Sequence, residues 1–327
     1  MHGTGTSDRV ASFTVVALGV ALGLAGSGLG VTVELAEGAF PGRNGLIAFS
    51  SDRTTGPGVD NPTGDDEIFT MNPDGTGVTQ LTKNTVFDGD PAWSADGRKI
   101  AFVSYRDGNA ELYTMAANGG KQTRRTSNDV GDFQPAWSPD GKKIAFRSFR
   151  DGSHDIFTMR ASGGSPIQRT TDRGSDFDPA WSPNGKKIAF SSDRDGGLDI
   201  FTMRANGANQ VNLTNNGASN IDPAWAPNGK QLAFNSTLNS NGDRDWEIYR
   251  MSASGTNRVN LTDNVEFDWL PAWSPDGKQI AYGSHRLTNG NDSEIFVMGV
   301  NGDNPTNRTN DPAATDAAPD WQPRRRR

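Results

Sequence analysis

The fold is decided by one stretch, Pro135-Ala136-Trp137-Ser138-Pro139-Asp140-Gly141-Lys142-Lys143-Ile144-Ala145-Phe146, because it returns along the chain with small changes. Its Pro-Ala-Trp opening recurs at spacings of 44, 44, 44, 48 and 48 residues. The six copies lie at 91–93, 135–137, 179–181, 223–225, 271–273 and 319–321, and the sixth reads Pro-Asp-Trp. A fixed period of this size marks a repeat architecture, in which each unit buries its apolar face against its neighbours.

Each repeat contains four short segments. The tryptophan is followed by a tight turn such as 138–141, which has proline early and glycine late. Two apolar runs come next, exemplified by 144–146 and 156–159, and then a short segment that ends in Leu-Thr or Arg-Thr. These runs of β-branched and aromatic residues predict strands, and none keeps a helical period. Four strands in a period of about 40–50 residues are typical of a β-propeller blade.

The two ends of the array are complementary. The segments 46–49, 68–71 and 81–82 open the array with no Pro-Ala-Trp before them, and nothing like Ile-Ala-Phe follows Trp321. We therefore predict an all-β, six-bladed propeller of four-stranded blades over residues 44–322. The C-terminal strand is expected to join the first blade, which closes the ring and removes its exposed edges.

The string at 135–146, with Arg150-Asp151-Gly152 and the run 155–159 beyond it, resembles the TolB-type propeller repeat, a relative of the tryptophan–aspartate propellers. The resemblance covers residues 44–322 and implies a propeller of this class. TolB itself is a periplasmic protein that has an α/β domain before its propeller and binds partners of the cell envelope. Only about forty residues precede the first blade here, so we expect the propeller without that domain.

Composition narrows the range of partners. The chain of 327 residues has a formal net charge of −7 and a pI near 5.1, which argues against nucleic acid or an anionic membrane as partner. It has no cysteine, so disulfides and thiolate metal sites are excluded. We expect a monomer without a cofactor.

Residues 1–39 differ in kind from the repeats. Arg9 precedes the apolar run 10–22, and small residues follow near Ala36 and Ala39, an order that predicts a signal peptide. A membrane anchor is the alternative, since Val10 to Val33 is long enough to span a bilayer. Either reading predicts an extracytoplasmic protein, which would be periplasmic, on the cell surface or secreted. Residues 323–327 are expected to be a basic tail beyond the last strand.

Histidine scarcity argues against catalysis. Of the three histidines, His2 lies in the leader, and His154 and His285 belong to different blades. No metal-binding or nucleophile motif accompanies them. We therefore predict a non-catalytic binding or scaffold propeller, and the alternative is a propeller lyase or hydrolase with acidic residues at the channel mouth.

An acid or its amide stands three residues before each repeat's proline, at the expected start of the innermost strand. The six positions are Asp88, Asp132, Asp176, Asn220, Asp268 and Asp316. One interpretation is that each side chain accepts hydrogen bonds from its own loop, as short acidic side chains do at turns. The other is a ring of carboxylates at the channel mouth that binds a ligand, with a cation such as Ca²⁺ as one candidate.

Loop length points to one sector of the ring. The step from the Phe or Tyr of the second strand to the acid that opens the third strand is nine residues in three blades. The same step is 13, 12 and 18 residues in the fifth, sixth and first blades. These three blades are adjacent once the ring closes, and insertions on one face often mark a binding face, although loop drift is the alternative. The predicted partner-binding residues are Asp60, Asp65, Asp66, Asp243, Asp245, Trp246, Trp269 and Asp292. We expect a protein, peptide or glycan of the cell envelope to bind there.

Overall fold

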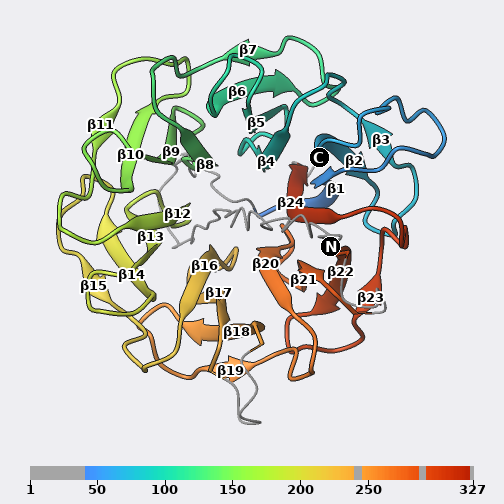
Figure 1. The fold of residues 1–327 in the computed structure, drawn as a ribbon. Coiled ribbons are helices and arrows are strands. Elements are labelled where there is room, and N and C mark those ends of the chain that lie inside the picture. The colour runs from blue at the N-terminus through green and yellow to red at the C-terminus, as the bar shows by residue number, and fades with distance from the viewer. Residues whose placement is uncertain (1–40, 239–244, 287–291, 325–327) are drawn as a thin grey trace, which may run out of the picture.

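The computed structural model describes residues 41–238, 245–286 and 292–324. In this part of the chain every regular element is a strand, and the strands form six antiparallel, four-stranded sheets arranged around a central axis (Figure 1). The six-bladed propeller predicted from the repeats is confirmed. The described residues contain no helix long and apolar enough to cross a membrane.

Each blade has four strands, which follow one another from the axis outward. Blade 1 has β24 (Asp316–Arg324), β1 (Arg43–Ser51), β2 (Glu67–Met71) and β3 (Thr79–Gln80). Blade 2 has β4 (Asp88–Trp93), β5 (Lys99–Ser104), β6 (Glu111–Ala116) and β7 (Thr123–Arg124). Blade 3 has β8 (Asp132–Trp137), β9 (Lys143–Ser148), β10 (Asp155–Arg160) and β11 (Ile167–Gln168).

The remaining three blades repeat this order. Blade 4 has β12 (Asp176–Trp181), β13 (Lys187–Ser192), β14 (Asp199–Arg204) and β15 (Val211–Asn212). Blade 5 has β16 (Asn220–Trp225), β17 (Gln231–Ser236), β18 (Glu247–Ser252) and β19 (Val259–Asn260). Blade 6 has β20 (Asp268–Trp273), β21 (Gln279–Ser284), β22 (Glu294–Gly299) and β23 (Thr306–Asn307).

Blade 1 is built from both ends of the repeat array. Strand β24 pairs antiparallel with β1, with Trp321 opposite Ile47 and Arg324 opposite Arg43. The predicted closure of the ring by the last strand is therefore confirmed. The strand also continues through Pro323 to Arg324, so these two residues belong to the blade and not to the basic tail predicted for 323–327.

The tryptophans join neighbouring blades. Trp137 of blade 3 is 4% exposed, and its Nε1 donates a hydrogen bond to the carbonyl oxygen of Ala92 in blade 2 at 3.1 Å. The same apolar cluster combines Val103 of blade 2 with Ile144 and Phe146 of blade 3. Apolar burial is the main favourable term in folding, so each blade is stabilised by the next one around the ring.

The two ends of the strands define two faces of the disc. We call the end with the turns 94–98, 138–142, 182–186, 226–230 and 274–278 the turn face. In the turn of blade 3, Ser138 Oγ donates to Asp140 Oδ1 at 2.6 Å, and Gly141 has a φ of 64°, which favours glycine. We call the opposite end the loop face, because it bears the loops that follow β1, β5, β9, β13, β17 and β21.

Candidate binding site on the loop face

The six predicted ring residues are the first residues of the innermost strands, and all of them are 0% exposed. Five of the six bind an arginine from the loop that follows the second strand of their own blade. The shortest N···O distances are 2.6 Å for Asp88–Arg106, Asp132–Arg150 and Asp176–Arg194, 2.7 Å for Asp316–Arg53 and 3.4 Å for Asp268–Arg286. Each of these carboxylates therefore has its countercharge within the protein.

Most of these arginines also lie over aromatic rings of their own blade. The Arg150 guanidinium carbon is 5.7 Å from the Phe146 ring centre and 5.6 Å from that of Phe157. Arg53, Arg106 and Arg194 lie in the same way over the paired rings of blades 1, 2 and 4. An arginine held between a carboxylate and two ring faces is fixed by both interactions. Three of these arginines are the first residues of the Arg-Asp-Gly segments 106–108, 150–152 and 194–196.

Blade 5 departs from the pattern at both positions. Asn220 replaces the aspartate, and Leu238 occupies the position at which the other blades have arginine. The backbone N–H of Leu238 donates a hydrogen bond to Ser236 Oγ at 3.0 Å. The Asn220 amide instead donates to Asn216 Oδ1 at 2.8 Å and accepts from Ser236 Oγ at 2.8 Å. Both charges are lost together, which leaves neither one buried alone.

Asparagine side chains connect the ring to the preceding blade. Asn84 donates to Asp88 Oδ2 at 2.7 Å and to Glu67 Oε2 at 3.2 Å, so it joins blade 2 to blade 1. Asn128 and Asn264 make the same bridges at the starts of blades 3 and 6. The ring carboxylates therefore bind arginine and asparagine side chains. One oxygen of each of Asp88, Asp132, Asp176 and Asp268 has no hydrogen-bond partner among the described residues. Ligand binding by this ring, Ca²⁺ included, stays a prediction.

A second ring lies two residues further along the innermost strands, and the sequence did not single it out. Its members, each directly before the repeat's proline, are Asp90, Gln134, Asp178, Asp222, Leu270 and Ala318. All six are buried and have φ values of 54–55°, in the left-handed region, and the pairing register shifts beside each one. A β-bulge re-aims side chains in this way. We call these residues the axial ring.

The polar members of the axial ring are linked from blade to blade. The N–H of Gln134 donates to Asp90 Oδ2 at 3.2 Å, and that of Asp178 to Gln134 Oε1 at 3.2 Å. The N–H of Asp222 donates to Asp178 Oδ2 at 3.4 Å. Within the part of the chain that the structure describes, Asp90 Oδ1 and Asp222 Oδ1 are buried without a hydrogen-bond partner. Two carboxyl oxygens near the axis are thus left to bind something else.

Burial raises the pKa of these carboxyls. The pKa of Asp90 is raised to about 7 and that of Asp178 to about 6, in both cases chiefly because burial removes water from the charged form. The pKa of Asp222 is raised well above its usual range by burial and then by the charge of Asp178 and a hydrogen bond to it. The charge of Asp90 in blade 2 also raises the pKa of Asp222 in blade 5, so the ring's acids act on one another across the axis.

Aromatic side chains and one arginine surround the polar half of this ring. The guanidinium of Arg147 lies 4.5 Å from the ring centre of Phe133 and 5.5 Å from that of Phe177. Burial lowers the pKa of Arg147, and the nearby charges of Asp178 and Asp90 partly oppose this shift. On the outer side, Tyr105, Phe149 and Phe267 are 39%, 45% and 42% exposed. The loop face therefore offers aromatic surface beside buried acids.

The predicted loop residues separate into an inner and an outer group. Asp66 and Asp292 belong to the inner group. Burial is the main cause that raises the pKa of Asp52, and the charge of Asp292 adds to it. The charge of Asp52 in turn acts on Asp66. Burial is the main cause that raises the pKa of Asp66 to about 7, and the charge of Asp90 adds to it. The long loops of blades 6 and 1 thus carry carboxylates that act electrostatically on one another and on Asp90 of the axial ring. We call Asp52, Asp66, Asp90 and Asp292 the acidic mouth.

The other predicted loop residues lie elsewhere. Asp60 is on the outer rim, where its backbone N–H binds Gln80 of β3 at 2.7 Å and its carboxylate lies 3.7 Å from Lys83. Asp65 accepts a hydrogen bond from Thr63, and Asp245 is 6% exposed. Trp246 and Trp269 are half-buried, and Asp243 lies outside the described residues. A role for these residues in binding remains a prediction.

The two histidines of the propeller are packed against aromatic rings in separate blades. His154 lies 5.0 Å from Phe149 and 5.5 Å from Phe177, and burial lowers its pKa to about 4. His285 lies 4.5 Å from Trp269 in an edge-to-face contact. Among the residues that the structure describes, no three His, Asp or Glu side chains are grouped so that they could hold a metal ion.

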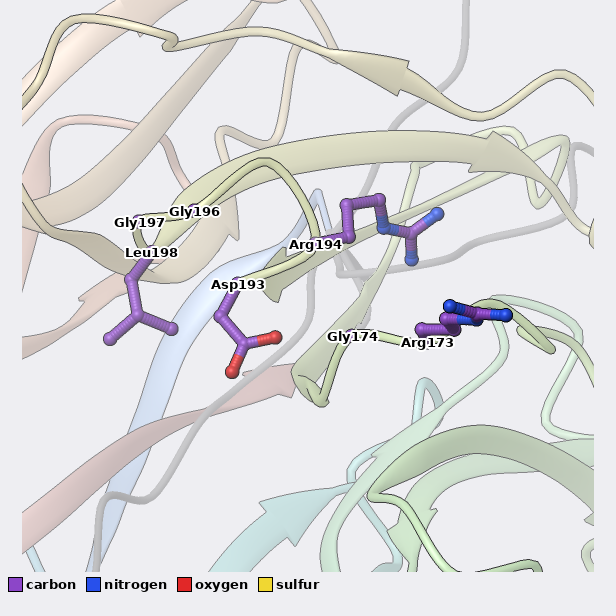
Figure 2. A pocket seen from close by; sticks show the side chains of 7 residues that line it. All are labelled: Arg173, Gly174, Asp193, Arg194, Gly196, Gly197 and Leu198. Carbon is purple, nitrogen blue, oxygen red and sulfur yellow. The ribbon is translucent and has the colours of Figure 1, made fainter.

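One surface depression lies on the loop face of blade 4 (Figure 2). Asp193 and Arg194 line one side of it, and Arg173 and Gly174 face them. Arg194 is already bound to Asp176 at 2.6 Å and to Asp172 at 2.9 Å. The depression therefore lies beside the buried ring, away from the long loops of blades 6 and 1.

Comparison with known proteins identifies the family. The sequence model described as TolB beta propeller domain matches residues 32–133, 127–243 and 211–327. The chain belongs to this family. No match was found among curated proteins.

Solved structures show the same fold at low identity. TolB from Acinetobacter baumannii is 23% identical with a TM-score of 0.74, over 86% of this chain and 67% of that chain. A putative TolB from Agrobacterium tumefaciens is 19% identical with a TM-score of 0.65, over 85% of this chain and 99% of that chain. An oligogalacturonate lyase from Vibrio parahaemolyticus is 15% identical with a TM-score of 0.52, over 81% of this chain and 73% of that chain. At these identities the likeness concerns the fold alone.

Proposed function

We propose that this protein is an exported, non-catalytic binding propeller of the cell envelope or exterior. It binds a protein, peptide or glycan partner on the loop face, at the acidic mouth. The apolar run 10–22 supports export, and the TolB-like repeats support a binding role. A monomeric propeller suffices for this role, because the acidic mouth is built from one chain.

The observation that carries the proposal is the buried oxygen Asp90 Oδ1, which has no hydrogen-bond partner among the described residues and belongs to a carboxyl whose charge acts on Asp66 of the long loop of blade 1. A basic group from a partner would give this oxygen the hydrogen bond and the countercharge that it lacks. The exposed rings of Tyr105, Phe149 and Phe267 would cover the rest of the bound segment, since aromatic side chains are enriched at interfaces.

A lyase or hydrolase is the second candidate, favoured by the likeness in fold to an oligogalacturonate lyase. Two observations support the binding role over it. The pKa of His154 is lowered to about 4, and its ring is packed between Phe149 and Phe177, so this imidazole is a poor proton acceptor near pH 7. His285 belongs to another blade, where it packs on Trp269.

The test is affinity capture from an envelope extract with immobilised protein, at low and at high salt. Asp66→Asn/Asp90→Asn should lower the recovery of the partner about tenfold or more, because it removes two carboxylates from the acidic mouth. Asp151→Asn/Asp303→Asn removes the same number of carboxylates from exposed positions outside the acidic mouth and should have little effect. Equal recovery with both double variants, or capture that rises with salt, would refute the proposal.

A further inference from the structure

The turn face is strongly basic, in contrast to the acidic chain as a whole. Exposed cations stand at the turns and adjoining strand ends of all six blades: Arg43, Arg98, Lys99, Lys142, Lys143, Arg160, Lys186, Lys187, Arg204, Lys230, Lys278 and Arg324. Among the residues that the structure describes, none of these twelve side chains has a carboxylate within 4.0 Å. We call this set the basic face.

Like charges stand directly opposite each other on this face. Lys143 of β9 pairs in register with Arg160 of β10, and Lys187 of β13 with Arg204 of β14. Such cross-strand pairs are destabilising. Blade 5 has Gln231 opposite Ser252 and blade 6 has Gln279 opposite Gly299, so the repeat does not require these cations for folding.

Five exposed acids at this end of the strands compensate only part of this charge, and two of them, Asp74 and Asp303, lie in the outer turns of blades 1 and 6. Asp96, Asp140 and Asp276 occupy the turns of blades 2, 3 and 6, and their Oδ1 atoms accept hydrogen bonds from the turn's own serine and backbone. Blades 4 and 5 have asparagines at this position, Asn184 and Asn228. The basic charge is therefore greatest over blades 3 and 4.

The chain also enters the propeller on this face. The N–H of Gly42 donates to the carbonyl oxygen of Pro275, in the turn of blade 6, at 3.1 Å, and Arg43 lies opposite Arg324. The sequence before this point contains the apolar run 10–22, and the sequence after Arg324 consists of three further arginines. A leader that inserts in a membrane would thus hold the basic face toward the lipid.

We propose that the basic face docks on an anionic lipid surface, such as the headgroups of phosphatidylglycerol. Charge complementarity and the entry of the leader on the same face favour lipid over a free polyanion. Each Lys or Arg close to such a surface contributes about fivefold in affinity at moderate salt, so several of them bind appreciably without a pocket. The loop face, with its acidic mouth, then points away from the membrane and stays free for a partner.

The experiment measures co-sedimentation of the full chain with vesicles of phosphatidylcholine alone and with vesicles containing one-third phosphatidylglycerol. Lys143→Gln/Lys187→Gln introduces the residue that blades 5 and 6 already have at this position, so folding is preserved. Lys83→Gln/Arg173→Gln removes the same charge from exposed residues off the basic face and serves as the matched control. Neutral vesicles measure what the leader contributes by itself.

We expect the wild type and the control variant to bind the anionic vesicles more tightly than the neutral ones, with a steep loss as salt is raised. The Lys143→Gln/Lys187→Gln variant should lose roughly 25-fold in affinity for anionic vesicles and nothing for neutral ones. Equal affinity for the two kinds of vesicle, or equal losses in the two variants, would overturn the proposal. Binding to heparin or duplex DNA without binding to anionic vesicles would also overturn it and would identify a polyanion as the partner.

Discussion

Arg150 shows how single residues hold a blade together. It closes an ion pair with the buried Asp132 at 2.6 Å and covers the rings of Phe146 and Phe157. Because the carboxylate is 0% exposed, its charge depends on this partner. Blade 5 shows the other stable solution, in which Asn220 and a leucine replace both charges.

We expect Arg150→Leu to destabilise the protein by about 2–4 kcal/mol, because it leaves the Asp132 charge buried and unpaired. Asp132→Asn/Arg150→Leu reproduces the pair found in blade 5 and should recover a large part of that loss. Urea unfolding of the two variants and the wild type measures both effects. A double variant less stable than Arg150→Leu would contradict this account of the pair.

Trp137 makes a second residue-scale contribution through its packing between blades 2 and 3. Trp137→Ala should cost about 3–5 kcal/mol, as deletions of large buried aromatic side chains do. Trp137→Phe keeps most of the apolar contact and loses the hydrogen bond to Ala92, so its cost should be nearer 1–2 kcal/mol. Thermal melting compares them, and a loss below about 1 kcal/mol for the alanine variant would argue against burial of this ring.

At the scale of elements, β24 differs from the other five innermost strands. Where the others have the buried alanine of Pro-Ala-Trp, β24 has Asp320, which is 6% exposed and accepts a hydrogen bond from the backbone N–H of Trp93 in blade 2. Burial raises the pKa of Asp320 to about 8. We therefore expect this carboxyl of the closing strand to keep its proton in the folded protein at neutral pH.

Asp320→Asn should make the stability of the protein less dependent on pH. The ordinary pKa of the carboxyl is 3.8, so between about pH 4 and pH 8 the unfolded chain releases a proton that the folded protein keeps. The wild type loses stability as pH rises through this window, and the asparagine variant lacks that loss. The variant should melt at a higher temperature than the wild type at pH 8, and the two melting temperatures should converge near pH 4. A variant that melts at a lower temperature than the wild type at pH 8 would be evidence against a protonated Asp320.

The whole molecule has several carboxyls of this kind. Burial is the main cause that raises the pKa values of Asp66, Glu67, Asp90 and Glu247 to about 7. Their usual values are near 4, so the folded state binds more protons than the unfolded state between about pH 4 and pH 7. Stability that depends on uptake of protons falls as pH rises.

We therefore expect the melting temperature of the protein to fall between pH 5 and pH 8. Circular dichroism at several pH values measures this directly, with ionic strength held constant so that exposed charges are screened equally. A melting temperature that rises over the same interval would mean that these carboxyls are ionised in the folded protein.

The architecture of the whole molecule was predictable because it recurs. Six tryptophans at a near-constant period and two complementary ends left one way to close the ring, and β24 follows it. The candidate site was only partly predictable. The ring beginning with Asp88 was found through its recurrence. Its arginine partners were missed, because they lie 18 residues further along the chain or, for Asp316, near the other end of the array. The axial ring was missed because its residues vary from Asp90 to Leu270 and Ala318, and only the bulge, which the sequence does not show, gives them one location.

The pairing of β1 with β24 also decides how blade 1 bears a mechanical load. Arg43 lies opposite Arg324, so a pull that separates these two ends would open the antiparallel bonds one after another, from the turn face inward. A pull between Arg43 and a ligand held on the loop face is directed along β1 instead, and the bonds of β1 to β24 and to β2 share the tension. A propeller attached through its leader and bound to a ligand on its loop face is thus pulled parallel to β1, a direction in which many backbone hydrogen bonds resist the force together.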